Sequence, residues 1–252
     1  MTNTLRTHGL GISFGAFRAV NDVNLTLEPG ARQALIGPNG AGKTTLINLL
    51  TGVFMPTRGT IHMGDRELTS LSAHKRARMG LARTFQINTL FPSLTPLLSV
   101  VLAISEREGL GAVWWRPLTR NKALFDEAHT LLGRLKLDAL ADVPVAELAY
   151  GKQRLLEIAL AMAARPRILL LDEPAAGVPE DESGELFEAI AELPQDISIL
   201  FIEHDMKLVF RFSKRISVLV AGQILTEGTP AEIGVDPRVR EVYLGHAGAS
   251  HV

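Results

Sequence analysis

The stretch Gly37-Pro38-Asn39-Gly40-Ala41-Gly42-Lys43-Thr44 decides the fold of this chain of 252 residues. It fits the pattern G-x-x-x-x-G-K-[S/T], in which glycines let backbone N–H groups turn inward around phosphate oxygens, where a side chain would collide. The apolar run Ala34–Ile36 precedes the stretch, and Lys43–Leu50 follows it with a helical pattern. A helix that begins here adds its positive amino end to the loop. The sequence therefore predicts a phosphate-binding loop between a buried strand and a helix.

Two side chains of this loop have distinct expected tasks. Lys43 should reach the β- and γ-phosphates of a nucleotide, and the hydroxyl of Thr44 should ligate Mg²⁺. Thr45, the next residue, is also expected to bind the nucleotide. The predicted nucleotide ligands are thus the whole loop and the threonine that follows it.

A phosphate loop needs an acidic partner for the metal, and the segment Ile168–Glu173 supplies one. Its four apolar residues predict a buried strand. Asp172 and Glu173 follow at the carboxyl end of that strand, where open α/β sheets gather their ligands. Asp172 should hold Mg²⁺, directly or through water, and Glu173 should polarise the water that attacks the γ-phosphate.

Strand-like and helix-like segments alternate along most of the chain. The expected strands include Asn21–Leu27, Ile168–Leu171, Ile197–Ile202 and Ile216–Val220. The expected helices include Gly151–Ala164, Glu180–Leu193 and Met206–Phe212. Between Asn88 and Leu148 the β-branched runs disappear, and helical periodicity is clearest over Leu124–Leu137. This order predicts a mainly parallel sheet with helices on both faces and a helical insertion.

Composition excludes several classes of protein. Hydrophobic residues make up 46% and charged residues 21%, as in ordinary globular domains. Lys and Arg number 26 against 27 acidic residues, so the net charge of -1 lacks the basic excess of a dedicated nucleic-acid binder. The chain has no cysteine, which excludes disulfides, thiolate metal sites and cysteine nucleophiles. No nucleic-acid partner is therefore expected.

Neither a membrane span nor a signal peptide is expected, although the mean hydropathy is +0.17. The best candidate span, Leu94–Ile104, contains Pro96 and falls well short of the ~20 residues that a spanning helix needs. Arg6 and His8 interrupt any apolar stretch at the amino end.

A short basic helix is predicted between Ser72, its cap, and Gly80. Its basic side chains are those of His74, Lys75, Arg76 and Arg78. We interpret them as a solvated helix face, with contact to a phospholipid or a membrane permease as the alternative.

Three further segments gain meaning from their order along the chain. Gln86 follows the strand-like Leu81–Phe85, His204 follows Ile197–Ile202, and a helix opens with Leu148-Ala149-Tyr150-Gly151-Lys152-Gln153-Arg154. With the phosphate loop and the acidic pair, this order resembles that of an ATP-binding-cassette ATPase from about Leu10 to Leu244. The resemblance is strongest with the ATP-binding subunits of branched-chain amino-acid importers, through Ala82–Gln86, Leu156–Ala159, Asp172–Gly177, Ile202–Val209, Glu227–Pro230 and Val242–Gly245.

The resemblance implies an α/β fold of three parts. A P-loop NTPase (RecA-like) core would hold a mixed, mainly parallel sheet with an N-terminal antiparallel β-region, and an α-helical subdomain would be inserted into it. The corresponding boundaries are residues 1–87 for the first part of the core, 88–150 for the helical subdomain with the signature segment, and 151–252 for the second part of the core.

The family resemblance also implies a mechanism. Two cassettes would sandwich two ATP molecules, each held by the P-loop of one subunit and the signature segment of the other, here Leu148, Ala149, Tyr150, Gly151, Lys152 and Gln153. Gln86 would sense Mg²⁺ and the attacking water, and His204 would contact the γ-phosphate and hold Glu173 in line. By position Phe14 matches the aromatic residue that stacks on adenine, with Phe17 as its nearby rival.

The implied function is ATP hydrolysis that powers uptake of branched-chain or related hydrophobic amino acids. The implied partners are a second cassette, which is a copy or a paralogue, transmembrane permease subunits that receive the motion through the helical insertion, and indirectly an extracytoplasmic solute-binding protein. The chain would be peripheral, at the cytoplasmic face of the inner (plasma) membrane. Alternatives are an exporter ATPase resembling those of lipopolysaccharide export, a soluble cassette of translation or DNA repair, and a P-loop kinase.

Two departures from the family pattern stand out. The common signature is Leu-Ser-Gly-Gly-Gln, whereas Ala149 and Tyr150 here replace the serine and the first glycine, as in the branched-chain subfamily. Pro179 occupies the D-loop position that usually carries Asp or Asn. A proline cannot make that polar contact across the dimer, so we expect either altered coupling between the two sites or a partner subunit that carries the better site.

Overall fold

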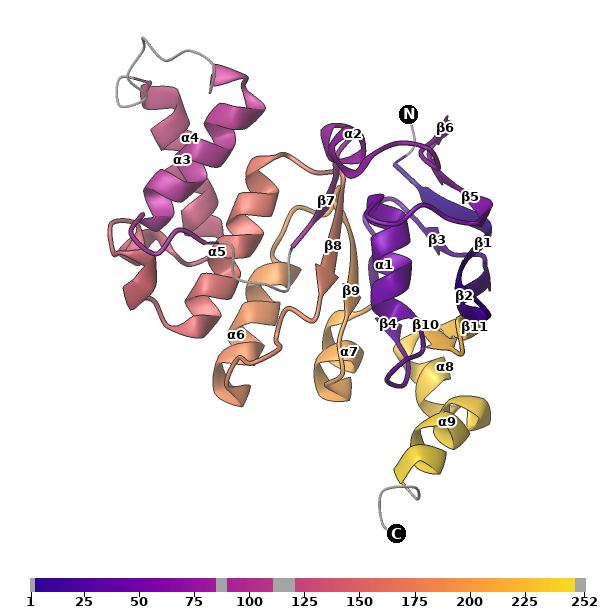
Figure 1. Ribbon diagram of the computed structural model, residues 1–252. Coiled ribbons are helices and arrows are strands. Elements are labelled where there is room, and N and C mark those ends of the chain that lie inside the picture. The colour runs from indigo at the N-terminus through magenta and orange to yellow at the C-terminus, as the bar shows by residue number, and fades with distance from the viewer. Residues whose placement is uncertain (1–2, 85–89, 111–120, 248–252) are drawn as a thin grey trace. The chain divides into compact units, whose positions relative to one another are not determined.

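The computed structural model of the chain describes residues 3–84, 90–110 and 121–247, except for the side chains of Asp181 and of residues 244–247 (Figure 1). By its internal contacts the chain divides into two units. The first comprises residues 1–81, 167–173 and 195–252, and the second comprises residues 82–166 and 174–194.

The main sheet has the strand order β11-β10-β4-β9-β8-β7. Four neighbouring strands run parallel and are buried along most of their length: β10 (Arg215–Val220), β4 (Arg32–Ile36), β9 (Ser198–Ile202) and β8 (Ile168–Asp172). At the edges, β11 (Gln223–Gly228) is antiparallel to β10, and β7 (Leu81–Arg83) completes the order. The predicted mixed, mainly parallel sheet is confirmed.

A second, antiparallel sheet is formed by the amino-terminal part of the chain. Its strands are β1 (Leu5–Phe14), β2 (Phe17–Val23), β3 (Thr26–Leu27), β5 (Arg58–Met63) and β6 (Arg66–Glu67). The single strand expected over Asn21–Leu27 is instead split between β2 and β3. The break falls at Asn24 and Leu25, and the Asn24 side chain accepts a hydrogen bond from the Gly9 N–H at 2.8 Å.

Helix α1 (Lys43–Thr51) lies between the two sheets (Figure 1). Its apolar side chains join a buried cluster with residues of both sheets, including Leu10 and Val23 from the antiparallel sheet and Leu170 and Leu200 from the main sheet. This burial of apolar surface fixes the helix that follows the phosphate loop.

The other helices of the first unit begin at polar caps or prolines. Helix α2 spans Ala73–Arg78 after Ser72, and α7 spans Met206–Phe212 after Asp205, whose carboxylate accepts the Lys207 N–H. Thr229 and Glu232 form a capping box at α8 (Pro230–Val235), and α9 spans Pro237–Ala247.

The second unit is helical, as predicted for the insertion. It contains α3 (Pro96–Arg107), α4 (Lys122–Arg134), the short 3₁₀ turns η3 (Asp138–Leu140) and η4 (Val145–Glu147), α5 (Tyr150–Ala163) and α6 (Glu180–Ala191). Arg107 of α3 pairs with Glu127 of α4 at 2.8 Å and donates to the Ala163 carbonyl of α5 at 2.7 Å. No helix in the described ranges is long and apolar enough to cross a bilayer.

The contact-based division differs from the predicted boundaries. Helices α5 and α6, which the sequence places in residues 151–252, group by their contacts with the helices of the second unit. The physical reason is that α5 packs against α3 and α4, and α6 packs against α5.

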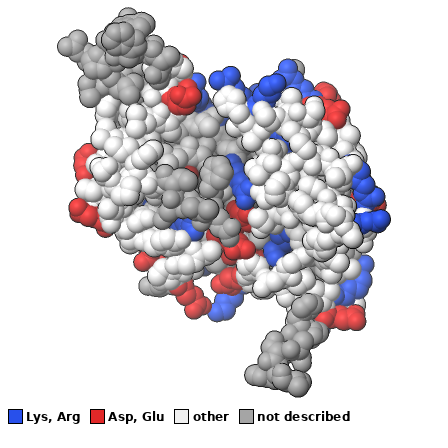
Figure 2. All heavy atoms as spheres, viewed as in Figure 1, with Lys and Arg blue, Asp and Glu red and all other residues white. Residues whose placement is uncertain are grey.

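The basic helix α2 is only partly a solvated face, which corrects the expectation for Arg76. Lys75 and Arg78 are exposed, and Figure 2 shows basic side chains gathered at the top of the view. Arg76 is fully buried and donates to the carbonyls of Leu49 and Leu50, in the last turn of α1, at 2.6 and 2.8 Å. Burial lowers the pKa of its guanidinium. Arg76 therefore satisfies the carboxyl end of α1, where a cation also meets the negative end of the helix dipole.

Replacing Arg76 by Met should lower the free energy of unfolding by about 2–4 kcal/mol, because buried carbonyls lose charged donors. Urea denaturation followed by circular dichroism measures the change. The control Arg78→Met removes an exposed arginine of the same helix and should change stability by less than about 0.5 kcal/mol. Equal stability of the two variants would contradict the assigned role of Arg76.

Candidate active site

The phosphate loop connects β4 to α1, and its glycines adopt backbone conformations that other residues avoid. Gly42, the N-cap of α1, has a φ of 101°, and a Cβ at this position would overlap the Ala19 carbonyl oxygen. A Cβ at Gly37 would likewise overlap the Leu219 carbonyl oxygen of β10. The Gly222 N–H donates to the Ala41 carbonyl at 2.9 Å. Neighbouring strands therefore hold the loop by its backbone, and only glycine fits at the contact points.

Lys43 is buried at the first position of α1. Its ammonium donates to the Gly37 and Pro38 carbonyls at 2.8 and 3.0 Å. Burial lowers the pKa of Lys43, and the nearby carboxylates of Glu173 and then Asp172 oppose this effect. The cation is thus held within the loop and faces two carboxylates from the end of β8.

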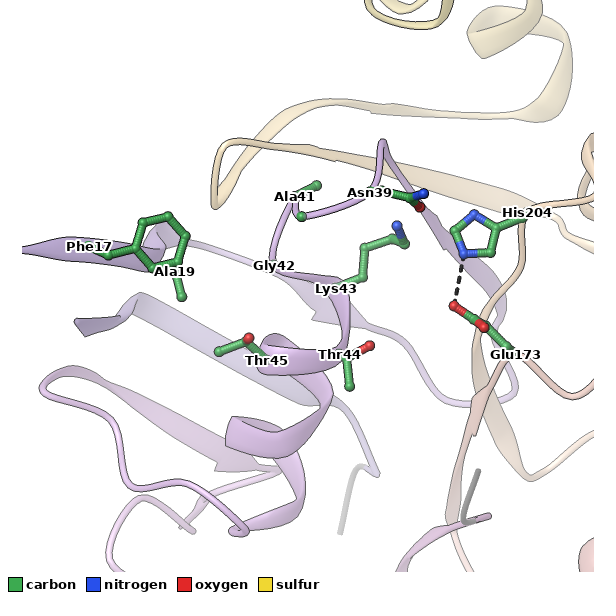
Figure 3. Close-up of a pocket in the computed structure, with 11 residues that line it drawn as sticks. Phe17, Ala19, Asn39, Ala41, Gly42, Lys43, Thr44, Thr45, Glu173 and His204 are labelled. Atoms are coloured by element: carbon green, nitrogen blue, oxygen red, sulfur yellow. Dashed lines mark hydrogen bonds and ion pairs between the residues drawn. The ribbon is translucent and has the colours of Figure 1, made fainter. Parts of the chain in front are cut away.

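Glu173 and His204 form a hydrogen-bonded pair. Glu173 follows β8, and its Oε1 lies 2.8 Å from His204 Nε2, in the segment after the neighbouring strand β9 (Figure 3). The backbone of Glu173 has a left-handed φ of 52°, and its N–H donates to the Ile202 carbonyl at 3.1 Å. Such a conformation is costly for a residue with a side chain, and functional sites are where such strain is concentrated.

These groups meet in one pocket of about 400 Å³ (Figure 3). The residues that line it are Phe17, Ala19, Asn39, Gly40, Ala41, Gly42, Lys43, Thr44, Thr45, Glu173 and His204. Backbone amides and a cation thus face one side of the pocket, and a carboxylate–imidazole pair faces the other. This arrangement can bind a polyphosphate and present a base beside it.

Comparison with known proteins agrees with this geometry. Residues 20–176 match the ABC transporter family, and residues 223–249 match the family described as branched-chain amino acid ATP-binding cassette transporter. The chain belongs to the ABC transporter family. As a member of it, the chain is an ATP-binding cassette that hydrolyses ATP.

The curated relatives of this cassette extend over nearly its whole length. It is 45% identical over 250 residues to the high-affinity branched-chain amino acid transport ATP-binding protein LivG of Escherichia coli, covering 96% of this chain and 98% of LivG. It is 42% identical to the corresponding protein BraF of Pseudomonas aeruginosa, with the same coverage. Among solved structures, the cassette MJ1267 in its ADP conformation superposes with a TM-score of 0.84 at 30% identity, over 97% of this chain and 99% of MJ1267.

Seven of the nucleotide ligands expected from the sequence line the pocket, but Phe14, Gly37 and Pro38 do not. Gly37 and Pro38 turn their carbonyls to Lys43 instead. Asp172 is 2% exposed at the end of β8, close enough to Lys43 to affect its pKa. Gln86 lies outside the residues that the structure describes.

Of the two aromatic candidates, Phe17 lines the pocket of the cassette and Phe14 does not. Phe14 and Phe17 face each other across the turn between β1 and β2. The Phe14 ring is turned edge-on to Phe54, with centroids 5.6 Å apart, whereas Phe17 is 64% exposed and lines the pocket. Both phenylalanines were candidates from the sequence. In the structure the Phe14 ring contacts Phe54, and the Phe17 ring is the one at the pocket.

Tyr243 is a neighbour of the phosphate loop that sequence reasoning did not single out as a site residue. It lies on α9, and its hydroxyl faces the backbone N–H of Gly37. Partial burial raises its pKa to about 12, which the Gly37 N–H opposes. A tyrosine near the carboxyl end of a chain carries no local signal of such a role, since the contact joins residues 206 positions apart.

The signature segment lies in the helical unit, at the start of α5. Ala149 is the N-cap and is exposed with Tyr150, whereas Leu148 and Gly151 are buried. The Gln153 side chain donates to the Leu148 carbonyl at 3.0 Å. The amino end of α5 therefore presents backbone amides beside the ring of Tyr150.

No group of three or more His, Asp or Glu among the described residues could hold a metal ion by itself. The oxygen donors next to the phosphate loop include the Thr44 hydroxyl and the carboxylates of Asp172 and Glu173. Hard oxygen donors in small number fit Mg²⁺, which keeps several waters and takes phosphate oxygens as further ligands.

Gly42→Ala should destabilise the cassette far more than Gly40→Ala. Both positions have a positive φ, so both variants carry about 1–2 kcal/mol of backbone strain. Only Gly42 adds a collision with a carbonyl, since a Cβ at Gly40 meets nothing within 4 Å. Thermal unfolding of the purified variants measures the difference, and equal melting temperatures would contradict the tight packing of the loop.

Proposed function

We propose that this cassette supplies the ATP-driven step of an importer for branched-chain or related hydrophobic amino acids. The observation that carries the proposal is the pocket that joins the phosphate loop to the Glu173–His204 pair. The match of residues 223–249 and the names of LivG and BraF support the class of substrate. Exporter and non-transport functions are not favoured by these relatives.

In the proposed reaction, the loop amides and Lys43 bind the β- and γ-phosphates of ATP. Glu173 accepts a proton from the attacking water, and His204, hydrogen-bonded to Glu173, holds that carboxylate in line. Thr44 and Asp172, with Gln86, would hold Mg²⁺, which neutralises charge that develops on the phosphates. Phe17 stacks on the adenine ring.

The proposed assembly contains a second cassette, identical or paralogous. The signature segment of each subunit, Leu148–Gln153, contacts the γ-phosphate of ATP held by its partner, through the amides at the start of α5. Hydrolysis then removes the bridge between the subunits.

The helical unit passes this movement to transmembrane permease subunits. An extracytoplasmic solute-binding protein delivers the amino acid to those permeases. The cassette itself lies at the cytoplasmic face of the inner (plasma) membrane as a peripheral subunit.

Uptake of radiolabelled leucine, in cells of the source strain that lack this chain, tests the function. We expect the wild-type gene to restore uptake and Glu173→Gln to fail at equal expression. Competition by unlabelled isoleucine, valine and other amino acids then maps the range of substrates. If leucine uptake does not depend on the chain, the assigned substrate is wrong, although the ATPase chemistry stands.

Glu173→Gln should bind ATP but hydrolyse it roughly 10²–10⁴ times more slowly, because the general base is lost. Release of phosphate from the purified protein measures turnover, and fluorescence of a labelled ATP measures binding. Glu67→Gln, an exposed carboxylate on β6, is the matched control and should leave both unchanged. Wild-type turnover in Glu173→Gln would rule out its role as base.

Phe17→Ala should weaken ATP affinity roughly 5- to 100-fold, the worth of one base–aromatic stack. Phe14→Ala removes the contact with Phe54 and should lower stability while leaving ATP affinity almost unchanged. Titration of both variants with labelled ATP distinguishes them. If only Phe14→Ala weakens ATP binding, Phe14 is the residue that stacks on adenine, as the family resemblance implies.

A further inference from the structure

Tyr150 is held firmly in place at the start of the signature helix. Its hydroxyl accepts a hydrogen bond from an Arg154 guanidinium N–H at 2.7 Å, and the same guanidinium lies over the ring, 5.0 Å from its centroid. Another N–H of Arg154 pairs with Glu157 at 2.8 Å. The Arg154 and Glu157 side chains are only 6% and 8% exposed.

Burial of this ion pair costs desolvation free energy. Desolvation raises the pKa of Glu157, with the pairing to Arg154 opposing it. Arg154 Nε and Glu157 Oε1 have no hydrogen-bond partner among the described residues. Such a pair is weak evidence of a gain in stability, because apolar residues of similar volume in its place often leave a protein equally stable. What the pair does here is fix the Tyr150 side chain.

The fixed ring of Tyr150 contacts the turn that follows β8 and Glu173. Gly177 in that turn has a φ of 77°, and a Cβ there would lie 3.2 Å from Cε1 of Tyr150 and 3.5 Å from its hydroxyl. The turn continues through Pro179, the N-cap of α6. Any side chain at Gly177 would thus press against the ring.

Two further contacts join the first turn of α5 to α6. A Cβ at Gly151 would overlap the Glu182 carboxylate of α6 and would touch the Glu182 Cβ at 3.4 Å, so the first turn of α5 lies directly against α6. Lys152 pairs with Glu185 at 3.1 Å. The first turn of α5 and the amino end of α6 are therefore in contact at successive positions.

We propose that Tyr150, positioned by Arg154 and Glu157, braces the signature segment against the 174–179 turn, so that the two segments move as one body. We call residues Tyr150, Arg154, Glu157 and Gly177 the brace. Tyr150 is a positioning residue in this role.

The consequence rests on the proposed function, in which both segments meet the partner cassette. Pro179 cannot supply the polar contact expected at its position between the subunits. With the brace, ATP that engages the signature segment also sets the 174–179 turn, which directly follows Glu173 in the chain. The brace thereby couples the two sites within each subunit, in place of the missing contact between subunits.

Amide hydrogen exchange of the full-length protein without nucleotide tests the brace itself. Tyr150→Ala should speed exchange in both segments 148–153 and 174–179, roughly tenfold, since a charge-assisted contact is lost. Tyr150→Phe keeps the ring against Gly177, loses the hydrogen bond and should give a smaller change in both. The control Arg107→Met removes the ion pair between α3 and α4 and a hydrogen bond to the far end of α5, at Ala163, and should leave both segments unchanged. Faster exchange in 148–153 alone would overturn the brace.

Dimerisation of the Glu173→Gln protein with MgATP tests its role in coupling. In this background the double substitution Arg154→Met and Glu157→Met, which leaves the signature segment unchanged but releases Tyr150, should need roughly ten times more ATP for half-dimerisation by light scattering, whereas Arg107→Met should match the parent. Dimerisation of this double variant at the parent's ATP concentration would overturn the coupling role. If the parent binds ATP yet stays monomeric, the proposed sandwich is wrong, and the exchange measurement still decides the brace.

Discussion

Close packing of the phosphate loop against neighbouring backbone is the constraint on which the first unit depends. The carbonyls of Ala19 and Leu219 lie where a Cβ of Gly42 or Gly37 would be, and the Gly222 N–H donates to the Ala41 carbonyl. These contacts come from β2, from β10 and from the turn after β10, which lie far from the loop in sequence. The loop can present its amides to a ligand because the surrounding strands hold its outer side.

A buried cation donates hydrogen bonds to backbone carbonyls at each end of α1. One of the two cations is also available for phosphate binding, and the other serves stability alone. Lys43 donates to the carbonyls of Gly37 and Pro38 at the amino end, and Arg76 donates to the last turn at the carboxyl end. The first cation is available to phosphate, because phosphate oxygens are better acceptors than the carbonyls that it contacts. The second has no such alternative and is structural.

The reacting groups occupy the carboxyl ends of adjacent parallel strands. Glu173 follows β8 and His204 follows β9, and the register of these strands brings the two side chains to hydrogen-bond distance. In the helical unit, the position of Tyr150 likewise depends on contacts, one of them with Gly177, which is distant from it in the sequence. A costly buried pair fixes one side chain, and a glycine makes room for it.

The sequence by itself determined the phosphate loop, the acidic pair after an apolar strand, and the alternation that predicts a parallel sheet. These features are local, because backbone preference and hydrophobic periodicity act over a few residues. Only the tertiary structure decided that Phe17 rather than Phe14 faces the pocket, and that Arg76 is buried under α1 rather than solvated. It also placed Tyr243 beside Gly37 and α5 with the helical unit. Each of these depends on contacts between residues distant in sequence, which no local pattern encodes.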